Sequence, residues 1–424
     1  MHSPLEPIAQ VDEKLRLRTR LSRLFIGFVL LQAIFALGVL VKSRYVARKR
    51  EATRPATYPS VDFPPITLTR EVDSMHLYMR GDELMEDIVA AIDGARTEIL
   101  VETFIWVDDA SGRIVRDALR RARGRGVQVH VLWDWLLSDH AINAVWFGDG
   151  IEAYPFKQIT PGLNALRPGN FLRDHRKLVV VDHEVGFIGG YNFGEPFLQW
   201  RDTHLRLEGA SVLELANAFG DFWNQHVPNG ATRLANVPGR AWDPHVLVHR
   251  NDPSLGIFPI RGMYLEAIDR AADRIWITNA YFVPDRAFRD SLTEAARRGV
   301  DVRVLLPEHS NHPMTDALAH GMFEDLLAAG VRVFLYRNFM LHAKTAVIDD
   351  AWVTVGTANI DRWSMLGNYE VNLEVHDAKL AAQLGDLYEV DMQNSNEVHL
   401  EAWRRRPLHW KVTERVLRNL APLM

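Results

Sequence analysis

The sequence predicts an α/β fold of two similar repeats, each a mixed sheet flanked by helices, packed with pseudo-two-fold symmetry. Three observations lead to this prediction. The motif His-x-Lys-x4-Asp occurs twice, at 175–182 and 342–349, and each copy is followed at one shared spacing by Gly and then Asn. The segments that precede the two copies also match one another. An apolar run from 24 to 41, in which only Gln32 is polar, adds one N-terminal transmembrane helix.

The N-terminal region is predicted to anchor the chain in a membrane. Residues 1–23 form a basic segment, residues 24–42 the transmembrane anchor and residues 43–72 a proline-containing linker that would space the body from the bilayer. The apolar run lacks a small-x-small cleavage site, which favours an anchor over a cleaved signal peptide. Basic residues flank it equally on both sides, so the positive-inside rule leaves its orientation open.

Matched segments predict the order of strands and helices in each repeat. The pairs are 95–106 with 272–283, 120–134 with 293–307, and 150–156 with 330–336. The first pair is typical of an apolar strand after a short helix. The second is typical of a helix that ends at Gly126 or Gly299 and continues into a strand, and the third is another strand. This alternation indicates two α/β domains, which we predict at 73–238 and 239–397.

Both motifs lie in apolar, β-branched runs that are typical of buried strands, at 178–181 and 346–348. Side chains two residues apart on a strand share a face, so each strand presents one His beside one Lys. The pairs are His175 with Lys177 and His342 with Lys344. Lys is scarce in this Arg-rich chain, and its use here suggests a need for a compact point charge.

The other motif residues leave more than one interpretation open. Asp182 and Asp349 lie an odd number of residues from the Lys, so a turn or supporting role suits them as well as a direct chemical role. The shared tail adds two glycines, which would let the backbone approach a ligand closely, and two asparagines, which add neutral donors. These residues are Gly189, Asn192, Gly356 and Asn359.

Two His, two Lys and two Asn side chains that converge on one point suit a phosphodiester. The Lys and Asn groups would neutralise and position phosphoryl oxygens. One imidazole can attack phosphorus to give a covalent phospho-His, while the other protonates the leaving alcohol and later deprotonates the attacking one. This scheme requires no metal and no cofactor. The motifs can cooperate if the two halves pack face to face, so we predict the site at their interface.

These motifs resemble those of the phospholipase D superfamily in its two-motif, single-chain form. Further strings resemble bacterial cardiolipin synthases: NFLRDHRKLVVVD, FIGGYNFG, WRDTHLRLEG, NAYFVPD and VGTANIDRWSMLGNYEVNLEV. The resemblance extends from about residue 75 to the end of the chain. It departs from the family at Gly190, where a small hydroxyl residue is common in one half.

The resemblance implies a role for each residue of the site. It makes His175 the nucleophile and His342 the general acid and base, an order that the residues alone leave open. The phosphoryl group would be held by Lys177, Lys344, Asn192 and Asn359. Asp182 and Asp349 complete the motifs, and Glu370 and Asp202 resemble the acidic residues that support the histidines.

The resemblance also implies an activity. A phosphatidyltransferase of this type makes cardiolipin from two phosphatidylglycerol molecules and releases glycerol, through a phosphatidyl-histidine intermediate. A phospholipase D that uses water, a transferase that uses another alcohol, and a tethered phosphodiesterase or nuclease remain as alternatives. The resemblance favours the bacterial inner membrane, with the active site facing the cytoplasm. The expected partner is phosphatidylglycerol in the membrane, and the oligomeric state is left open.

Composition limits other classes of function. The chain has no Cys, which excludes disulfides, thiol catalysis and Cys-ligated zinc. His309, His312 and His320 are spaced like metal ligands, but Pro313 indicates a loop, so no metal site is expected. The body after residue 50 is acidic, which disfavours nucleic acid as a partner. The basic, amphipathic tail at 398–424 suits either an interfacial helix or a helix packed on the second domain.

Overall fold

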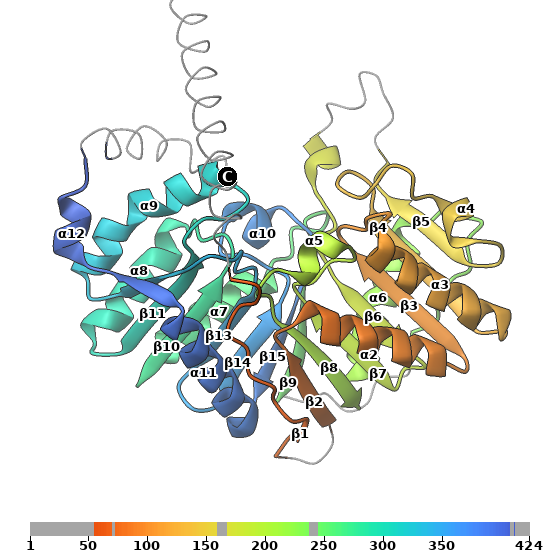
Figure 1. Cartoon of the computed structure of the whole chain (residues 1–424), viewed down its shortest axis with the longest axis horizontal. Helices are drawn as coiled ribbons and strands as arrows, with labels where there is room; N and C mark the ends of the chain where they lie inside the picture. The colour runs from red at the N-terminus through yellow and green to blue at the C-terminus, as the bar shows by residue number, and fades with distance from the viewer. Residues whose placement is uncertain (1–54, 70–72, 159–167, 237–244, 408–410, 412–424) are drawn as a thin grey trace, which may run out of the picture. The chain divides into compact units, whose positions relative to one another are not determined.

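The computed structural model describes residues 55–69, 73–158, 168–236, 245–407 and 411 (Figure 1). The basic segment at 1–23 and the transmembrane helix predicted at 24–42 lie outside the described residues. Among the residues that are described, no helix is both long and apolar enough to cross a bilayer.

The first half of the body contains a mixed sheet. Its strands are β1 (Ile66–Thr67), β2 (Asp73–Tyr78), β3 (Glu98–Thr103), β4 (Gln128–Asp134), β5 (Glu152–Phe156), β6 (Leu178–Val181), β7 (Val185–Gly189) and β8 (His204–Gly209). The strand order is β1-β2-β8-β7-β6-β3-β4-β5, and only β3, β4 and β5 pair in parallel. The helices are α2 (Gly81–Gly94), α3 (Ala110–Gly124), α4 (Ala144–Phe147), the 3-10 turn η2 (Pro168–Phe171), α5 (Glu195–Leu198) and α6 (Val212–His226).

The second half contains a sheet of the same kind. Its strands are β9 (Val246–Asn251), β10 (Arg274–Asn279), β11 (Asp301–Pro307), β12 (Arg332–Tyr336), β13 (Lys344–Ile348), β14 (Trp352–Gly356), β15 (Glu370–His376) and β16 (Ser395–Val398). The strand order is β16-β12-β11-β10-β13-β14-β15-β9, and β10, β11 and β12 pair in parallel. The helices are α7 (Pro259–Arg270), α8 (Arg286–Arg297), α9 (Pro313–Ala328), α10 (Arg362–Leu366), α11 (Ala378–Gln393) and α12 (Leu400–Arg404).

The two sheets repeat one another strand by strand. The order β2-β8-β7-β6-β3-β4-β5 in the first half corresponds to β9-β15-β14-β13-β10-β11-β12 in the second. Each half then adds one strand at opposite edges, β1 beside β2 and β16 beside β12. The predicted pair of mixed α/β sheets with flanking helices is therefore confirmed.

Equivalent helices also begin and end alike. Asp109 and Asp285 precede α3 and α8, and the carboxylate of each accepts a hydrogen bond of 2.9 Å from a backbone N–H in the first turn. Beyond the helix ends, Gly126 has φ 95° and Gly299 has φ 98°. Glycine adopts this left-handed conformation without steric cost, so both helices end where the sequence predicts.

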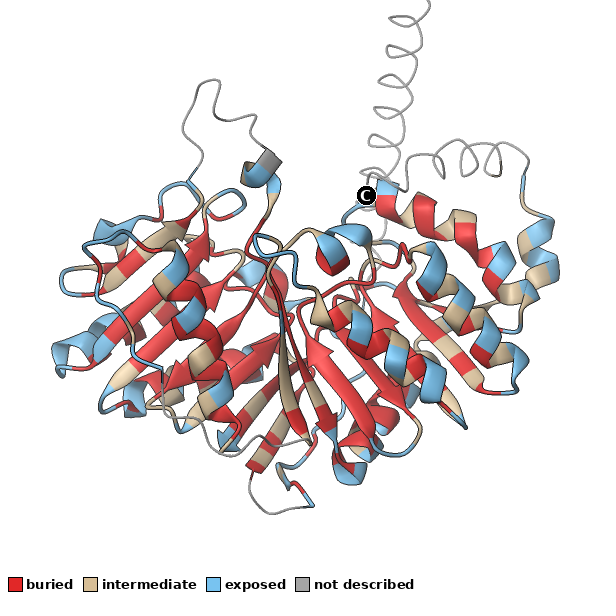
Figure 2. Ribbon diagram, turned by 180° about the vertical axis from the view of Figure 1, so that it is seen from behind, coloured by how far each residue is buried: buried red, intermediate tan, exposed pale blue. Residues whose placement is uncertain are grey.

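The hydrophobic core joins the two halves. Helices α2 and α3 cover one face of the first sheet, and α7, α8 and α9 cover one face of the second. The opposite faces share a single apolar cluster, which runs from Val180 and Leu205 through α6 to Val353, Leu373 and α11. Figure 2 shows the buried strands of both sheets and the exposed outer faces of the helices. Because the halves share buried apolar surface, burial of this surface holds them together.

Part of the segment predicted as a linker packs on the body. Tyr58 and Phe63 are buried, and the Tyr58 hydroxyl donates to the carbonyl oxygen of Met79 at 2.7 Å. The backbone N–H of Thr69 donates to Asp377 of the second half at 2.7 Å. From Tyr58 to Thr69 the segment therefore contacts both halves, whereas 43–54 and 70–72 lie outside the described residues.

The start of the predicted tail packs on the second domain. β16 ends at Val398, one residue beyond the predicted domain boundary. On α12, the Trp403 ring lies 5.1 Å from the Phe323 ring of α9, and Arg404 pairs with Glu324 at 2.9 Å. Helix α12 therefore packs on the second domain. The amphipathic stretch from 412 to 424 lies outside the described residues.

Candidate active site

The two motif histidines lie where the halves meet. The His175 N–H donates to the carbonyl oxygen of Tyr369 at 3.0 Å, and the His342 N–H donates to the carbonyl oxygen of Arg201 at 2.7 Å. Each of these bonds crosses between the halves. The reciprocal bonds join Tyr369 N–H to Arg173 and Arg201 N–H to Met340, at 3.0 and 2.8 Å. The two bridges follow one pattern, as pseudo-two-fold symmetry requires.

Each half supplies the acidic partner of the other half's histidine. Nδ1 of His175 lies 2.9 Å from Oε2 of Glu370, and Nδ1 of His342 lies 2.6 Å from Oδ2 of Asp202. Both carboxylates are buried. With Nδ1 engaged, Nε2 is the nitrogen of each ring left for chemistry. The site is therefore complete only when both halves are present.

Burial and the nearby lysines favour the neutral form of both imidazoles. Burial, followed by the charges of Lys177 and Lys344, holds the pKa of His175 well below its usual value. Burial and Lys344 lower the pKa of His342 to about 3, although Asp202 opposes this shift. A neutral imidazole has a lone pair available for nucleophilic attack or for accepting a proton.

The motif lysines are buried beside the histidines. Nζ of Lys177 donates to the backbone carbonyl oxygen of His175 at 2.7 Å, and Nζ of Lys344 donates to that of His342. Burial lowers the pKa of Lys177 to about 7 and that of Lys344 to about 8. An ammonium group has three donors, so each lysine retains donors for a phosphoryl oxygen.

The two acidic partners differ in their environment. The Thr357 hydroxyl donates to Oε2 of Glu370 at 2.5 Å, and burial raises the pKa of Glu370 to about 8. At the matched position of the first half stands Gly190, where a Cβ atom would lie 2.1 Å from Oδ1 of Asp202. Burial raises the pKa of Asp202, but His342 and Lys344 outweigh it and hold that pKa below its usual value. The site is therefore asymmetric, with the ionised carboxylate beside His342.

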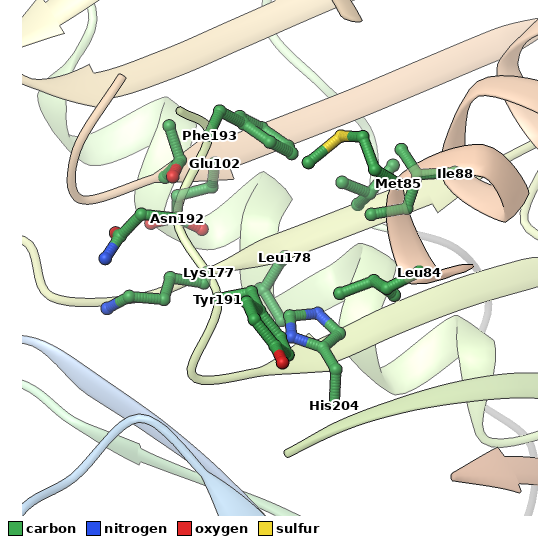
Figure 3. A pocket seen from close by; sticks show the side chains of 12 residues that line it. Leu84, Met85, Ile88, Glu102, Lys177, Leu178, Tyr191, Asn192, Phe193 and His204 are labelled. Atoms are coloured by element: carbon green, nitrogen blue, oxygen red, sulfur yellow. The ribbon is translucent and has the colours of Figure 1, made fainter. Parts of the chain in front are cut away.

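The motif asparagines are buried near the lysines. Oδ1 of Asn192 accepts from the backbone N–H of Ile105 at 3.1 Å, which leaves its amide NH₂ as a donor. Oδ1 of Asn359 has no hydrogen-bond partner among the described residues. Figure 3 shows the tips of Lys177 and Asn192 together, on the opposite side of a small pocket from Met85 and Ile88. The two donors therefore form one polar corner.

The motif aspartates lie at the other ends of their strands. Asp182 accepts from the backbone N–H groups of Arg96, Thr97 and Glu98 at 2.7–3.0 Å. Asp349 accepts in the same way from Ala272, Asp273 and Arg274. A strand of four or five residues separates each aspartate from its histidine, a distance of about 13 Å or more. Of the two interpretations left open for Asp182 and Asp349, these contacts favour the turn role.

The motif glycines meet protein atoms instead of an open ligand site. A Cβ atom at Gly189 would lie 2.4 Å from the carbonyl oxygen of Thr203, and one at Gly356 would lie 2.4 Å from Cγ of Asn372. Both positions therefore require glycine for packing. They let β8 and β15 pack closely beside the catalytic strands.

Sequence reasoning missed three groups around the histidines. Aromatic rings pack on the imidazoles, Phe104 at 4.6 Å from His175 and Trp200 at 4.8 Å from His342. The Arg201 guanidinium forms a buried pair with Asp391 of α11, at 2.7 and 2.9 Å, and Arg201 precedes Asp202. Thr357 is the third. The contrast between Gly190 and Thr357 at matched positions was the available signal for it.

The histidines considered as metal ligands have different surroundings. His312 precedes α9, whereas His320 lies within α9 and packs against the rings of Phe323 and Trp403. Among the residues that the structure describes, no group of His, Asp or Glu side chains is arranged to hold a metal ion.

A model of the family described as "Cardiolipin synthase, PLD-like domain" matches residues 88–223 and 264–392, more than half of the chain. The chain belongs to this family of the phospholipase D superfamily. Cardiolipin synthase A of Pseudomonas putida GB-1 is 33% identical to it, over 83% of the chain and 75% of the relative. Cardiolipin synthase 1 of Staphylococcus aureus COL is 31% identical, over 82% of the chain and 73% of the relative.

Solved structures share the fold of this family member at low sequence identity. The phosphatidylserine synthase of Haemophilus influenzae Rd KW20 has a TM-score of 0.60 and 15% identity, over 89% of this chain and 97% of that one. The polyphosphate kinase of Porphyromonas gingivalis has a TM-score of 0.50 and 14% identity, over 86% of this chain and 57% of that one.

Proposed function

We propose that this chain is a phosphatidyltransferase that makes cardiolipin from two molecules of phosphatidylglycerol and releases glycerol. The observation that carries the proposal is that each of the two histidines receives its acidic partner from the other half. Two imidazoles beside two lysines suit a reaction that passes a phosphoryl group through one nitrogen and protons through the other. The relatives named cardiolipin synthases support the choice of lipid.

In the first half-reaction, Nε2 of His175 attacks the phosphorus of one phosphatidylglycerol. The bond from phosphorus to the headgroup glycerol oxygen breaks, and His342 donates a proton to that oxygen, so glycerol leaves. Lys177, Lys344 and the motif asparagines hold the phosphoryl oxygens, where charge develops in the transition state. The product is a phosphatidyl-histidine at His175.

In the second half-reaction, His342 takes a proton from a glycerol hydroxyl of a second phosphatidylglycerol. The oxygen attacks phosphorus, the bond between phosphorus and His175 breaks, and cardiolipin leaves. The assignment of His342 to the proton transfers is supported by the ionised state of Asp202, which favours an imidazolium. A bound phosphodiester anion would oppose the lysine charges and help His342 to take up its proton.

The proposal also covers the location of the enzyme. Residues 24–42 would form a single transmembrane anchor in the bacterial inner membrane, and the active site would face the cytoplasm. The apolar run and its basic flanks support the anchor, since such flanks suit anionic headgroups. Only the family resemblance supports the orientation.

The experiment supplies labelled phosphatidylglycerol in vesicles to the full chain, without added alcohol, and follows the lipids by chromatography. We expect cardiolipin and free glycerol in equal amounts. His175→Ala and His342→Ala should each lose at least about 100-fold in rate, the usual contribution of an acid, base or nucleophile. His399→Ala, an exposed histidine beside α12, serves as the matched control. Phosphatidic acid as the sole product would instead identify a hydrolase.

A further inference from the structure

Exposed apolar side chains gather at one edge of the described surface. Among the residues that the structure describes, eleven large apolar side chains are exposed, and six of them lie in four segments beside the active site. We call these six the apolar rim: Leu137 after β4, Phe171 in η2, Leu255 and Ile257 after β9, and Trp363 and Leu366 in α10. Single exposed apolar residues are common on soluble proteins, but a cluster indicates an interaction surface.

The strand registers bring the four segments to the edge that carries the histidines. β4 ends at Asp134, whose carboxylate accepts from the N–H of Asp174, the neighbour of His175. β9 ends at Asn251, which lies opposite Glu370 across the β9–β15 pair. η2 ends four residues before His175, and α10 begins three residues after Asn359. Figure 1 shows α10 at the upper edge of the body, over the junction of the two halves.

Hydrogen bonds tie the segments into one surface. The Asn251 amide donates to the carbonyl oxygen of Ser364 in α10 at 2.9 Å, so the loop after β9 adjoins α10. The N–H of Arg173, after η2, donates to Asn368 at 3.2 Å. The Arg173 guanidinium also contacts Asp134, which caps the loop that carries Leu137. These contacts therefore link the four segments along the side of the site that carries His175 and Glu370.

The rim lies beside a site that is itself almost closed to solvent. His175 is 7% exposed and His342 is 4% exposed, whereas Leu255 is 67% exposed and Leu137 is 53% exposed. Under the proposed function, the substrate is a diacyl lipid whose headgroup must reach these histidines from this edge. A second copy of the chain on the rim would cover that approach. A bilayer on the rim would instead deliver the substrate.

We propose that the apolar rim enters the headgroup region of a phospholipid bilayer and holds the catalytic edge against it, in addition to any N-terminal anchor. The rim has the composition of such a contact, with aliphatic side chains beside Phe171 and Trp363, whose rings suit the boundary between headgroups and acyl chains. The inference rests on the proposed function for its choice of a lipid surface.

The chain contains no Cys, so single labels can be introduced cleanly into the full-length protein. We would prepare Leu137→Cys, Leu255→Cys and Leu366→Cys, attach an environment-sensitive fluorophore, and reconstitute each variant into phosphatidylglycerol vesicles. Val145→Cys is the control, because Val145 is 84% exposed on α4 and does not belong to the rim. Quenching by lipids that carry a spin label on the acyl chain reports insertion.

The proposal predicts blue-shifted, quenched fluorescence at the three rim positions and water-like, unquenched fluorescence at position 145. Water-like fluorescence at the rim positions would overturn it. A blue shift that is already present in detergent without vesicles, and depends on protein concentration, would also overturn it in favour of a protein interface. This experiment does not measure cardiolipin formation. If the probes insert into the bilayer but the protein has no synthase activity, the proposed function is contradicted and the docking surface is supported.

Charge substitutions give a second measurement. Leu137→Asp combined with Leu255→Asp should slow cardiolipin formation on vesicles by about tenfold or more, because a buried charge is costly at the bilayer surface. The rate on a short-chain phosphatidylglycerol dissolved below its micelle concentration should be unchanged. Equal losses on both substrates would contradict a role at the membrane surface, and Val145→Asp provides the matched control.

Discussion

Two lysines are buried beside the reacting histidines, at a cost to folding that their chemistry explains. Lys177 is 2% exposed and Lys344 is fully buried, and burial lowers both pKa values. A folded pKa below the unfolded value means that the unfolded chain binds more protons between the two values. Stability should therefore rise with pH from about 7 toward 10. The lysines are retained because a phosphoryl group needs a cation at this point.

Lys177→Met should separate these two effects. Removal of the buried ammonium group is expected to stabilise the chain by about 1–3 kcal/mol near pH 6 and by less near pH 9, while activity is lost. Urea unfolding at the two pH values, with the assay on vesicles beside it, measures both. A variant less stable than the wild type near pH 6 would contradict the pKa of Lys177.

The pH dependence of kcat/KM should follow the same lysines. The free enzyme loses the ammonium protons of Lys177 and Lys344 as pH rises through about 7 to 8, so kcat/KM should fall in this range. The histidines, whose pKa values are lowered, should give no acid limb near 6.5. Initial rates on vesicles from about pH 5 to 9.5 test this. A kcat/KM that stays constant up to pH 9.5 would contradict the lowered pKa values of the two lysines.

At the scale of the elements, Gly190 at the end of β7 lies close to Asp202 before β8, the acidic partner of His342. A Cβ atom at position 190 would lie 2.1 Å from Asp202, so Gly190→Ala should displace the carboxylate from His342. We expect kcat to fall by about 100-fold, the cost of a displacement of roughly 1 Å. Gly94→Ala, where a Cβ atom meets nothing within 4 Å, is the control. Equal activity in the two variants would show that Asp202 tolerates displacement.

The turn after β13 tests the structural role of the motif aspartates. Asp349→Ala removes three hydrogen bonds to backbone N–H groups and should destabilise the chain by about 1–3 kcal/mol. Burial raises the pKa of Asp349, but these bonds outweigh it and hold the pKa below its usual value, so its contribution is lost as pH falls below about 4.

Asp350→Ala is the matched neighbour, since Asp350 is 91% exposed. Its unfolding midpoint should match that of the wild type. If Asp349→Ala keeps full stability but loses activity, the aspartate has a chemical role instead.

The limits of sequence-based prediction also appear at the scale of elements. The succession of strands and helices along the chain, the helix ends and the His–Lys pairs followed from local patterns, because apolar periodicity and glycine conformation are local properties. The packing of the linker did not follow. Tyr58 is buried only because Phe339 and Tyr191 meet it from distant parts of the chain, at 5.4 Å between rings and 3.4 Å between hydroxyls. Tertiary contacts of this kind leave no periodic signal.

At the scale of the whole molecule, a buried ion pair joins the two halves next to the active site. Arg201 and Asp391 are both fully buried, and Arg201 precedes Asp202. Asp391→Ala leaves a buried guanidinium unpaired and should destabilise the chain by about 3–5 kcal/mol. It should also lower kcat at temperatures where the variant is folded, because Arg201 positions Asp202. Calorimetry and initial rates measure the two effects, and unchanged stability would contradict the pairing. Asp221→Ala, on an exposed pair with Arg250, is the control.

The resemblance supplied what spacing alone did not, the role of Glu370 and Asp202 as acids that support the histidines. That each acid serves the histidine of the other half required the structure. The sequence separations of 195 and 140 residues place these couples beyond any local pattern. The asymmetry between Thr357 and Gly190, and with it the charge state of the two acids, required the assembled site.

The central claim is that the two matched histidines have different roles in one site, with the covalent bond at His175. The direct measurement mixes the full chain with phosphatidylglycerol carrying a labelled phosphate, quenches the reaction in alkali within one turnover, and maps the label by mass spectrometry. The account predicts label on the peptide that contains His175 and none on the peptide that contains His342. Label on His342 would reverse the roles, and cardiolipin formed without label on either histidine would contradict the covalent mechanism.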